Sequence, residues 1–128
     1  MTDSARVLSI SDDDGLRCSR ELLLSNEGYQ TESITSITPL SVSRVRSFDI
    51  ALICRSVEPE RAMVLTDMLR RYNPEIQIVC ISPLENRLAP CAADIEIPSG
   101  PEVVLETIRE LCNQRSARKV CYEASHHG

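Results

Sequence analysis

Polar side chains stand at the ends of several short apolar runs in this sequence: the acidic cluster Asp12, Asp13 and Asp14, the thiol of Cys54 and the hydroxyl of Ser82. Adjacent carboxylates can hold a divalent cation or cap the start of a helix. A thiol can react as its thiolate, and a serine hydroxyl can donate to an anion. If the runs are neighbouring parallel strands, their carboxyl ends share one edge, and we expect Asp12, Cys54 and Ser82 to line one pocket there.

Residue types that many enzymes use are missing from most of the chain. Both histidines, His126 and His127, lie within the last three positions, Lys119 is the only lysine, and there are four glycines. The sequence therefore offers no histidine general base, no Schiff-base lysine and no glycine-rich phosphate loop for a folded core. We expect that the protein is not an enzyme.

The segments that would position the polar side chains alternate between strand and helix. Apolar runs predict strands at 6–10, 29–34, 48–54, 76–81 and 95–97. Amphipathic segments predict helices from the acidic cluster to just before Gly28, then at 40–46, at 58–72 and at about 101–114. The stretch 82–93 contains two prolines and allows no more than about two helical turns. This alternation predicts an α/β domain with a parallel sheet covered by helices on both faces.

Length and charge predict one folded domain at 1–113, followed by a flexible basic tail at 114–128. The chain has 128 residues and a net charge of -5, whereas the tail carries three basic residues and one acidic residue. An acidic body repels nucleic acid and anionic lipid. We therefore expect neither nucleic acid nor a membrane as a partner.

Cysteine usage and the first residues of the chain indicate the compartment. The six cysteines include no CxxC pair and no zinc-like spacing with histidine, and residues 1–14 lack the apolar run of a signal peptide. Free thiols persist in a reducing environment. We expect a cytoplasmic protein.

Four segments carry a family likeness: VLSISDDDGLR at 7–17, ELLLSNEGY at 21–29, FDIALI at 48–53 and IVCIS at 78–82. In order and spacing they resemble the response-regulator receiver domains of bacterial two-component signalling. The resemblance covers residues 6–113. It implies a flavodoxin-like (βα)5 three-layer sandwich with a parallel sheet of order 2-1-3-4-5, here with a shortened fourth helix, and makes 1–113 a receiver-like domain.

Receivers accept a phosphoryl group from a histidine kinase on an aspartate that closes the third strand, beside an acidic pair that holds magnesium. The resemblance places this pair at Ser11 and Asp12 or, with a shift of one residue, at Asp12 and Asp13. It places the hydroxyl that contacts the phosphoryl group at Ser82. The phosphoacceptor position is occupied by Cys54.

Two of the family's four functional groups are therefore replaced in this chain. Cys54 stands where the acceptor carboxylate would be, and Pro98 or Ser99 stands where a lysine would neutralise the phosphoryl group. A free thiol has a pKa of about 8.5 and stays mostly protonated at neutral pH. Arg55 is the nearest cation in the sequence. These replacements imply a degenerate pseudo-receiver.

Each candidate residue also has a purely structural interpretation. The acidic cluster at the start of a helix is explained equally well by capping as by the remnant of a metal site. Cys54 fits a small buried hydrophobe better than a reactive thiol, since neither histidine nor lysine is near to lower its pKa. Ser82 fits a turn residue before Pro83.

Three hypotheses for function follow. The first is a stand-alone receiver-like module of phosphorelay signal transduction that acts by protein–protein interaction without phosphorylation. The second is a working phosphorelay receiver with an atypical acceptor carboxylate, for example Asp13. The third is a thiol redox sensor based on Cys54. We expect a protein partner, either a histidine kinase or a downstream effector, and a monomer or weak homodimer. No cofactor is expected beyond weak Mg²⁺ binding at Asp12 and Asp13.

Overall fold

The computed structural model describes the backbone of residues 5–82, 95–98 and 100–127. In chain order the elements are β1 (Arg6–Ile10), α1 (Asp14–Asn26), β2 (Gln30–Ile34), α2 (Val42–Arg46), β3 (Ile50–Ile53), α3 (Pro59–Tyr72), β4 (Gln77–Ser82), β5 (Ile95–Pro98) and α4 (Pro101–His127). The predicted shortened fourth helix falls within 82–93, almost all of which lies outside the described residues.

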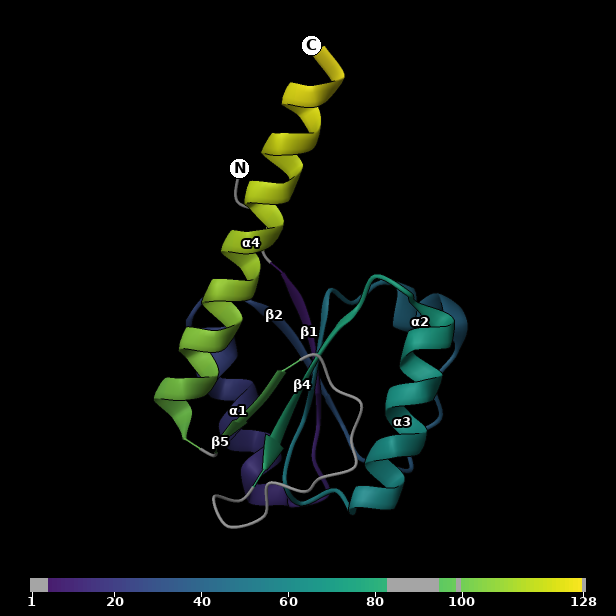
Figure 1. Cartoon of the computed structure of the whole chain (residues 1–128). Coiled ribbons are helices and arrows are strands. Elements are labelled where there is room, and N and C mark those ends of the chain that lie inside the picture. Colours follow the sequence, from purple (N-terminus) through teal and green to yellow (C-terminus); the bar gives the residue numbers. More distant parts are fainter. Residues whose placement is uncertain (1–4, 83–94, 99, 128) are drawn as a thin grey trace.

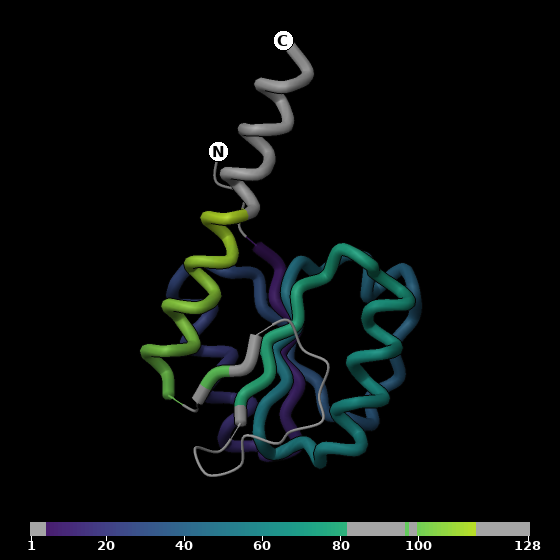
Figure 2. The backbone as a smooth tube through the Cα atoms, viewed as in Figure 1, coloured from purple at the N-terminus to yellow at the C-terminus, as the bar shows by residue number. Residues whose placement is uncertain are grey.

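The strands form one parallel sheet with helices on both faces, as the alternation of runs predicts. The sheet order is β2-β1-β3-β4-β5, and every neighbouring pair is parallel. The order of the first four strands, 2-1-3-4, agrees with the prediction, and β5 continues it beside β4. Figure 1 shows α1 and α4 on one side of the sheet and α2 and α3 on the other. Figure 2 shows the same two layers of helix as a continuous tube.

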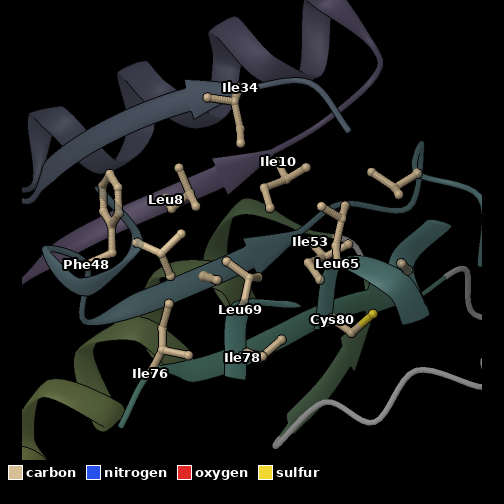
Figure 3. Close-up of a cluster of buried hydrophobic side chains, with 14 residues drawn as sticks. Leu8, Ile10, Ile34, Phe48, Ile53, Leu65, Leu69, Ile76, Ile78 and Cys80 are labelled. Carbon is tan, nitrogen blue, oxygen red and sulfur yellow. The ribbon is translucent and has the colours of Figure 1, made fainter. Parts of the chain in front are cut away.

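Successive side chains of the central strands point alternately into two separate apolar layers. On β3, Ala51 and Ile53 belong to the layer under α2 and α3, whereas Ile50, Leu52 and the residue after the strand, Cys54, belong to the layer under α1 and α4. We call these the α3-side layer and the α1-side layer. Figure 3 shows the α3-side layer, in which Leu65 and Leu69 of α3 lie over the strands. A strand buried on both faces explains why 50–54 is continuously apolar.

Helix α1 begins and ends where the sequence predicts. Asp13 is the N-cap, and its Oδ1 accepts a hydrogen bond of 2.9 Å from the Leu16 N–H. The helix ends at Asn26, and Gly28 follows with φ of 92°, a left-handed conformation that costs glycine least.

The last helix is longer than predicted. Amphipathic spacing predicts an end near residue 114, but α4 continues to His127. The additional residues contain neither proline nor glycine before Gly128, so local propensity allows the helix to continue after its apolar face has ended. Among the described helices, none combines the length and the apolar character needed to span a bilayer.

Candidate functional site

The predicted site residues gather, at the level of the backbone, at the carboxyl edge of the sheet. The Cys54 N–H donates to the Ile10 carbonyl at 2.9 Å, which places the end of β3 beside the end of β1. On the other side of β3, Ser82 is the last residue of β4. Of Ser82 only the backbone is described, so the pocket shared by Asp12, Cys54 and Ser82 stays a prediction.

Asp12 is bound to the loop that follows β2. Its Oδ1 accepts a hydrogen bond from the Ser36 N–H and its Oδ2 accepts one from the Ser36 hydroxyl, both at 2.7 Å. The backbone N–H of Asp12 donates to Ser56 Oγ at 2.9 Å. Both carboxylate oxygens of Asp12 therefore have a protein donor, and the side chain joins two loops at the edge of the sheet.

Asp13 and Asp14 serve helix α1. Asp13 caps its first turn, and Asp14 forms an ion pair of 2.6 Å with Arg17, three residues further along the same helix. For Asp13 the capping interpretation describes what the side chain does in this structure. The sequence cluster thus divides into three carboxylates with three separate sets of partners.

Two serines connect these groups: Ser11, which the resemblance had placed in the acidic pair, and Ser56, which lies two residues after Cys54. Ser11 Oγ lies 3.0 Å from Ser56 Oγ, donates to the Asp13 carbonyl at 3.2 Å and accepts from the Asp13 N–H at 3.3 Å. Ser11 is fully buried. The signal for both Ser56 and Ser36 was available: each follows a predicted strand by two residues, on the edge where ligands collect in parallel sheets.

Cys54 is buried in the α1-side layer, with 1% of its surface exposed. Burial raises the pKa of its thiol above the ordinary value of 9.0, and three neighbours oppose this: the Arg20 guanidinium and the hydroxyls of Ser9 and Ser11. The raised pKa keeps the thiol protonated at neutral pH. This agrees with the interpretation of Cys54 as a small buried hydrophobe and counts against a thiolate.

The cation beside Cys54 is Arg20, which the sequence analysis missed. Arg55, the nearest arginine in sequence, is exposed, whereas Arg20 is 5% exposed and lowers the pKa of the Cys54 thiol. Arg20 could have been found by helical spacing, because it precedes the buried Leu24 by four residues and so lies on the same face of α1.

The donor set at this edge does not fit Mg²⁺. The ion takes near-octahedral oxygen ligands and is usually held by carboxylates. Cys54 brings a thiol and no carboxylate to this edge, while Asp12 and Asp13 already accept hydrogen bonds from Ser36 and Leu16. Within the described ranges, no three His, Cys, Asp or Glu side chains are grouped so that they could hold a metal ion. At the fifth strand, Pro98 ends β5 and provides no amine, and Ser99 lies outside the described residues.

Comparison with known proteins identifies the fold. No protein-family model matches the sequence, and no curated protein matches it. Solved structures do match. A CheY-like response regulator receiver domain protein from Methanospirillum hungatei JF-1 has a TM-score of 0.65 at 20% identity, covering 91% of this chain and 99% of that one.

Two further structures agree. NtrX from Brucella abortus, in complex with ADP, has a TM-score of 0.71 at 21% identity; the match covers 91% of this chain and 29% of NtrX. A response regulator from Burkholderia pseudomallei that contains a phosphorylated aspartic acid, a calcium ion and citrate has a TM-score of 0.64 at 14% identity, covering 91% of this chain and 73% of that one. The chain has the flavodoxin-like fold of CheY-like receiver domains.

Proposed function

We propose that this chain is a receiver-like module of two-component signalling that acts by protein–protein interaction without being phosphorylated. The fold is that of receiver domains. The observation that carries the proposal is the side chain that follows β3: a buried thiol at Cys54, whose pKa burial raises, in place of a carboxylate.

The chemistry of phosphoryl transfer explains why this replacement matters. An acyl phosphate forms on a carboxylate, and charge on the transferring group is stabilised by a metal ion and by cationic side chains. Cys54 provides no carboxylate, and Asp12 and Asp13 are engaged with Ser36 and Leu16. The surface of the fold then remains as the functional part, with a protein as the partner, either a histidine kinase or a downstream effector.

A phosphorelay receiver that uses Asp13 as its acceptor is less well supported by the geometry. Asp13 Oδ1 caps α1 at 2.9 Å from the Leu16 nitrogen. The carboxylate of Asp13 is therefore already engaged in capping the helix, a role whose loss typically costs about 1 kcal/mol. A thiol redox sensor at Cys54 is less well supported by burial, since the thiolate is the reactive form and burial disfavours it.

The remaining parts of the proposal concern assembly, compartment and cofactors. We propose that the module works as a monomer or weak homodimer in the cytoplasm and needs no cofactor. The basic segment 114–128, which the sequence predicts as a flexible tail, continues α4 as far as His127.

The test is exposure of the purified chain to a small-molecule phosphodonor with Mg²⁺, followed by intact mass spectrometry. We expect no stable gain of about 80 Da, the mass of one phosphoryl group. Cys54→Asp alone should also gain little mass, because the carboxylates at Asp12 and Asp13 stay bound to the protein. A receiver that retains its acceptor aspartate serves as the positive control.

Two results would contradict the proposal. One is a stoichiometric mass gain on the wild-type chain. The other is a gain that disappears in Asp13→Asn but persists in Cys54→Ser, which would assign the acceptor role to Asp13 and support the phosphorelay alternative.

A further inference from the structure

The buried face of helix α4 ends well before the helix does. Val104, Ile108 and Leu111 are buried in the α1-side layer, whereas Gln114 is already exposed. The backbone nevertheless stays helical to residue 127, and Figure 1 shows the second half of α4 extending beyond the end of the sheet. At a rise of about 1.5 Å per residue, the segment 115–127 spans roughly 20 Å. We call this segment the overhang.

A helix of this length needs support from something that it packs against. Isolated helices shorter than about 12–15 residues are marginal in water, even in alanine-rich sequences. The overhang contains two alanines, Ala117 and Ala124, among mostly polar residues. A partner that covers the overhang would therefore stabilise its helical form.

Helical spacing continues the buried face of α4 as a row of basic residues. Arg115 and Arg118 follow the buried Leu111 by four and seven residues. Lys119 and Tyr122 follow Arg115 by the same two intervals. Positions at these intervals share one face of a helix. We call Arg115, Arg118, Lys119 and Tyr122 the basic face.

The overhang and the rest of the chain have opposite net charges. The overhang contains three basic residues and one acidic residue, so it contributes +2 to a total of -5 and leaves -7 on the rest. The Debye length is about 8 Å at physiological ionic strength, less than half the length of the overhang. Salt therefore screens much of the overhang from the acidic body, and an anionic partner can approach it there.

We propose that the basic face is the docking site for an acidic segment of a partner protein. The proposal rests on the function proposed above, which takes the partner to be a protein, and adds the chemistry of that partner. Guanidinium and ammonium groups bind carboxylates through charge-assisted hydrogen bonds. The rise from Arg115 to Tyr122 is about 10 Å, or about two helical turns. The complementary segment is therefore a helix with glutamates or aspartates at positions i, i+4 and i+7.

Two other anionic partners fit the charges less well. A nucleic acid duplex or a lipid bilayer is larger than the overhang and brings negative charge close to the acidic body as well. Helices that lie in a bilayer surface insert tryptophan, phenylalanine or leucine, and the overhang has none of the three. A short acidic segment approaches the overhang alone, which favours a protein partner.

The test measures binding of a fluorescently labelled peptide to the full chain by fluorescence anisotropy. The peptide is a helix former with glutamates at i, i+4 and i+7, and its control has glutamines at the same three positions. We expect saturable binding of the glutamate peptide that weakens as sodium chloride is raised, because salt screens exposed ion pairs. The glutamine peptide, a single-stranded oligonucleotide and phosphatidylserine vesicles should each bind more weakly.

The decisive variant combines Arg115→Gln, Arg118→Gln and Lys119→Gln. It removes three positive charges and keeps residues that favour a helix. Three exposed ion pairs together account for about tenfold in affinity, and we expect the Kd for the glutamate peptide to rise by that factor.

Two further variants separate the basic face from net charge and from a disordered basic tail. The matched control combines three changes at exposed positions outside the overhang, Arg55→Gln, Arg61→Gln and Arg71→Gln. It changes the net charge by the same amount and should bind as the wild type does. Ala117→Pro keeps every charge and interrupts the helix next to Arg118. We expect it to weaken binding severalfold, because the basic residues then no longer share one face.

The proposal is overturned if the glutamate peptide does not bind the wild-type chain, or binds the triple variant at 115, 118 and 119 as tightly. An equal loss in the control variant at 55, 61 and 71 also overturns it. Equal binding by Ala117→Pro overturns the assignment to a helical face, and tighter binding of the oligonucleotide or the vesicles overturns the choice of a protein partner. The phosphodonor experiment tests the function proposed above separately, since a mass gain at the carboxyl edge of the sheet does not involve the overhang.

Discussion

The two faces of the sheet have the same architecture and different chemistry. In the α3-side layer, the buried members of the central strands are apolar, among them Leu8, Ile10 and Ile53. In the α1-side layer, the fully buried Ser9 and the buried Arg20 lie beside Cys54. The same strands supply both layers. The difference therefore comes from Ser9, on the α1 side of β1, and from Arg20 on α1.

This difference separates a layer held by apolar contacts from a layer that also buries polar groups. An apolar layer is stabilised by burial alone, whereas buried polar groups need partners to avoid a desolvation cost. Apolar burial therefore stabilises both layers, and the polar part of the α1-side layer adds buried groups whose desolvation must be compensated by partners. Substitutions on the two faces should behave differently.

The largest effect is expected for a truncation in the α3-side layer. Leu69→Ala removes a fully buried side chain from α3 and should lower the free energy of unfolding by about 3 kcal/mol. Urea denaturation measures it. Leu22→Ala, at a position 64% exposed on α1, is the control and should cost less than about 0.5 kcal/mol. Equal losses in both variants would show that the layer is not packed as described.

A matched pair of serine substitutions, one on β3 and one at the residue after it, compares the two faces directly. Ala51→Ser introduces a hydroxyl into the α3-side layer and should lower the free energy of unfolding by about 2 kcal/mol. Cys54→Ser introduces one beside Ser9, Ser11 and Arg20 and should cost less than about 1 kcal/mol, since partners are at hand. Denaturation of both variants under one set of conditions gives the difference. If Cys54→Ser lowered the free energy of unfolding more than Ala51→Ser did, the two faces would not differ as described.

The raised pKa of Cys54 predicts a loss of stability in alkali. The folded chain holds the thiol proton more tightly than the unfolded chain does, so this stabilisation is complete below the ordinary value of 9.0. It is lost as the pH rises from there through the folded pKa, with a slope of at most about 1.4 kcal/mol per pH unit. Cys54→Ser should remove this slope.

The measurement is the free energy of unfolding at several pH values for both chains. Tyr29, whose pKa burial also raises above 10.0, contributes equally to both and cancels in the difference. If the free energy of unfolding changed with pH in the same way for the wild type and for Cys54→Ser, the environment assigned to Cys54 would be contradicted.

The smallest effect concerns the edge of the sheet. Ser36→Ala removes the hydroxyl that donates to Asp12 Oδ2 and should cost about 1 kcal/mol, since Asp12 itself is exposed and its hydrogen bonds compete with water. Ser19→Ala, at an exposed position on α1, is the control. A change no larger than in the control would mean that the Asp12–Ser36 contact does not hold the loop after β2.

The sequence predicted the order of the elements well because that order depends on local patterns. The apolar runs located the strands, the acidic cluster marked the start of α1, and Gly28 marked its end. The end of α4 was predicted too early, because periodicity reports where an apolar face ends and not where a helix ends.

The site was less predictable because its contacts join distant parts of the chain. Asp12 meets Ser36 across 24 positions, and Ser11 meets Ser56 across 45. No local pattern contains such a pair. The placement of Arg20 beside Cys54 depends on how α1 packs against the sheet, which sequence spacing restricts to one helix face without specifying a neighbour.

The most direct test is a titration of the isotope-labelled chain with Mg²⁺. The amide resonances of Asp12, Asp13 and Cys54 report whether the carboxylates of Asp12 and Asp13 keep their hydrogen bonds within the protein or bind the ion. We expect only small, non-saturating shifts through millimolar Mg²⁺, since both carboxylates keep their bonds to Ser36 and Leu16. Saturable shifts at Asp12 and Asp13 would show that a metal site of the phosphorelay type is intact and would contradict the proposed mode of action.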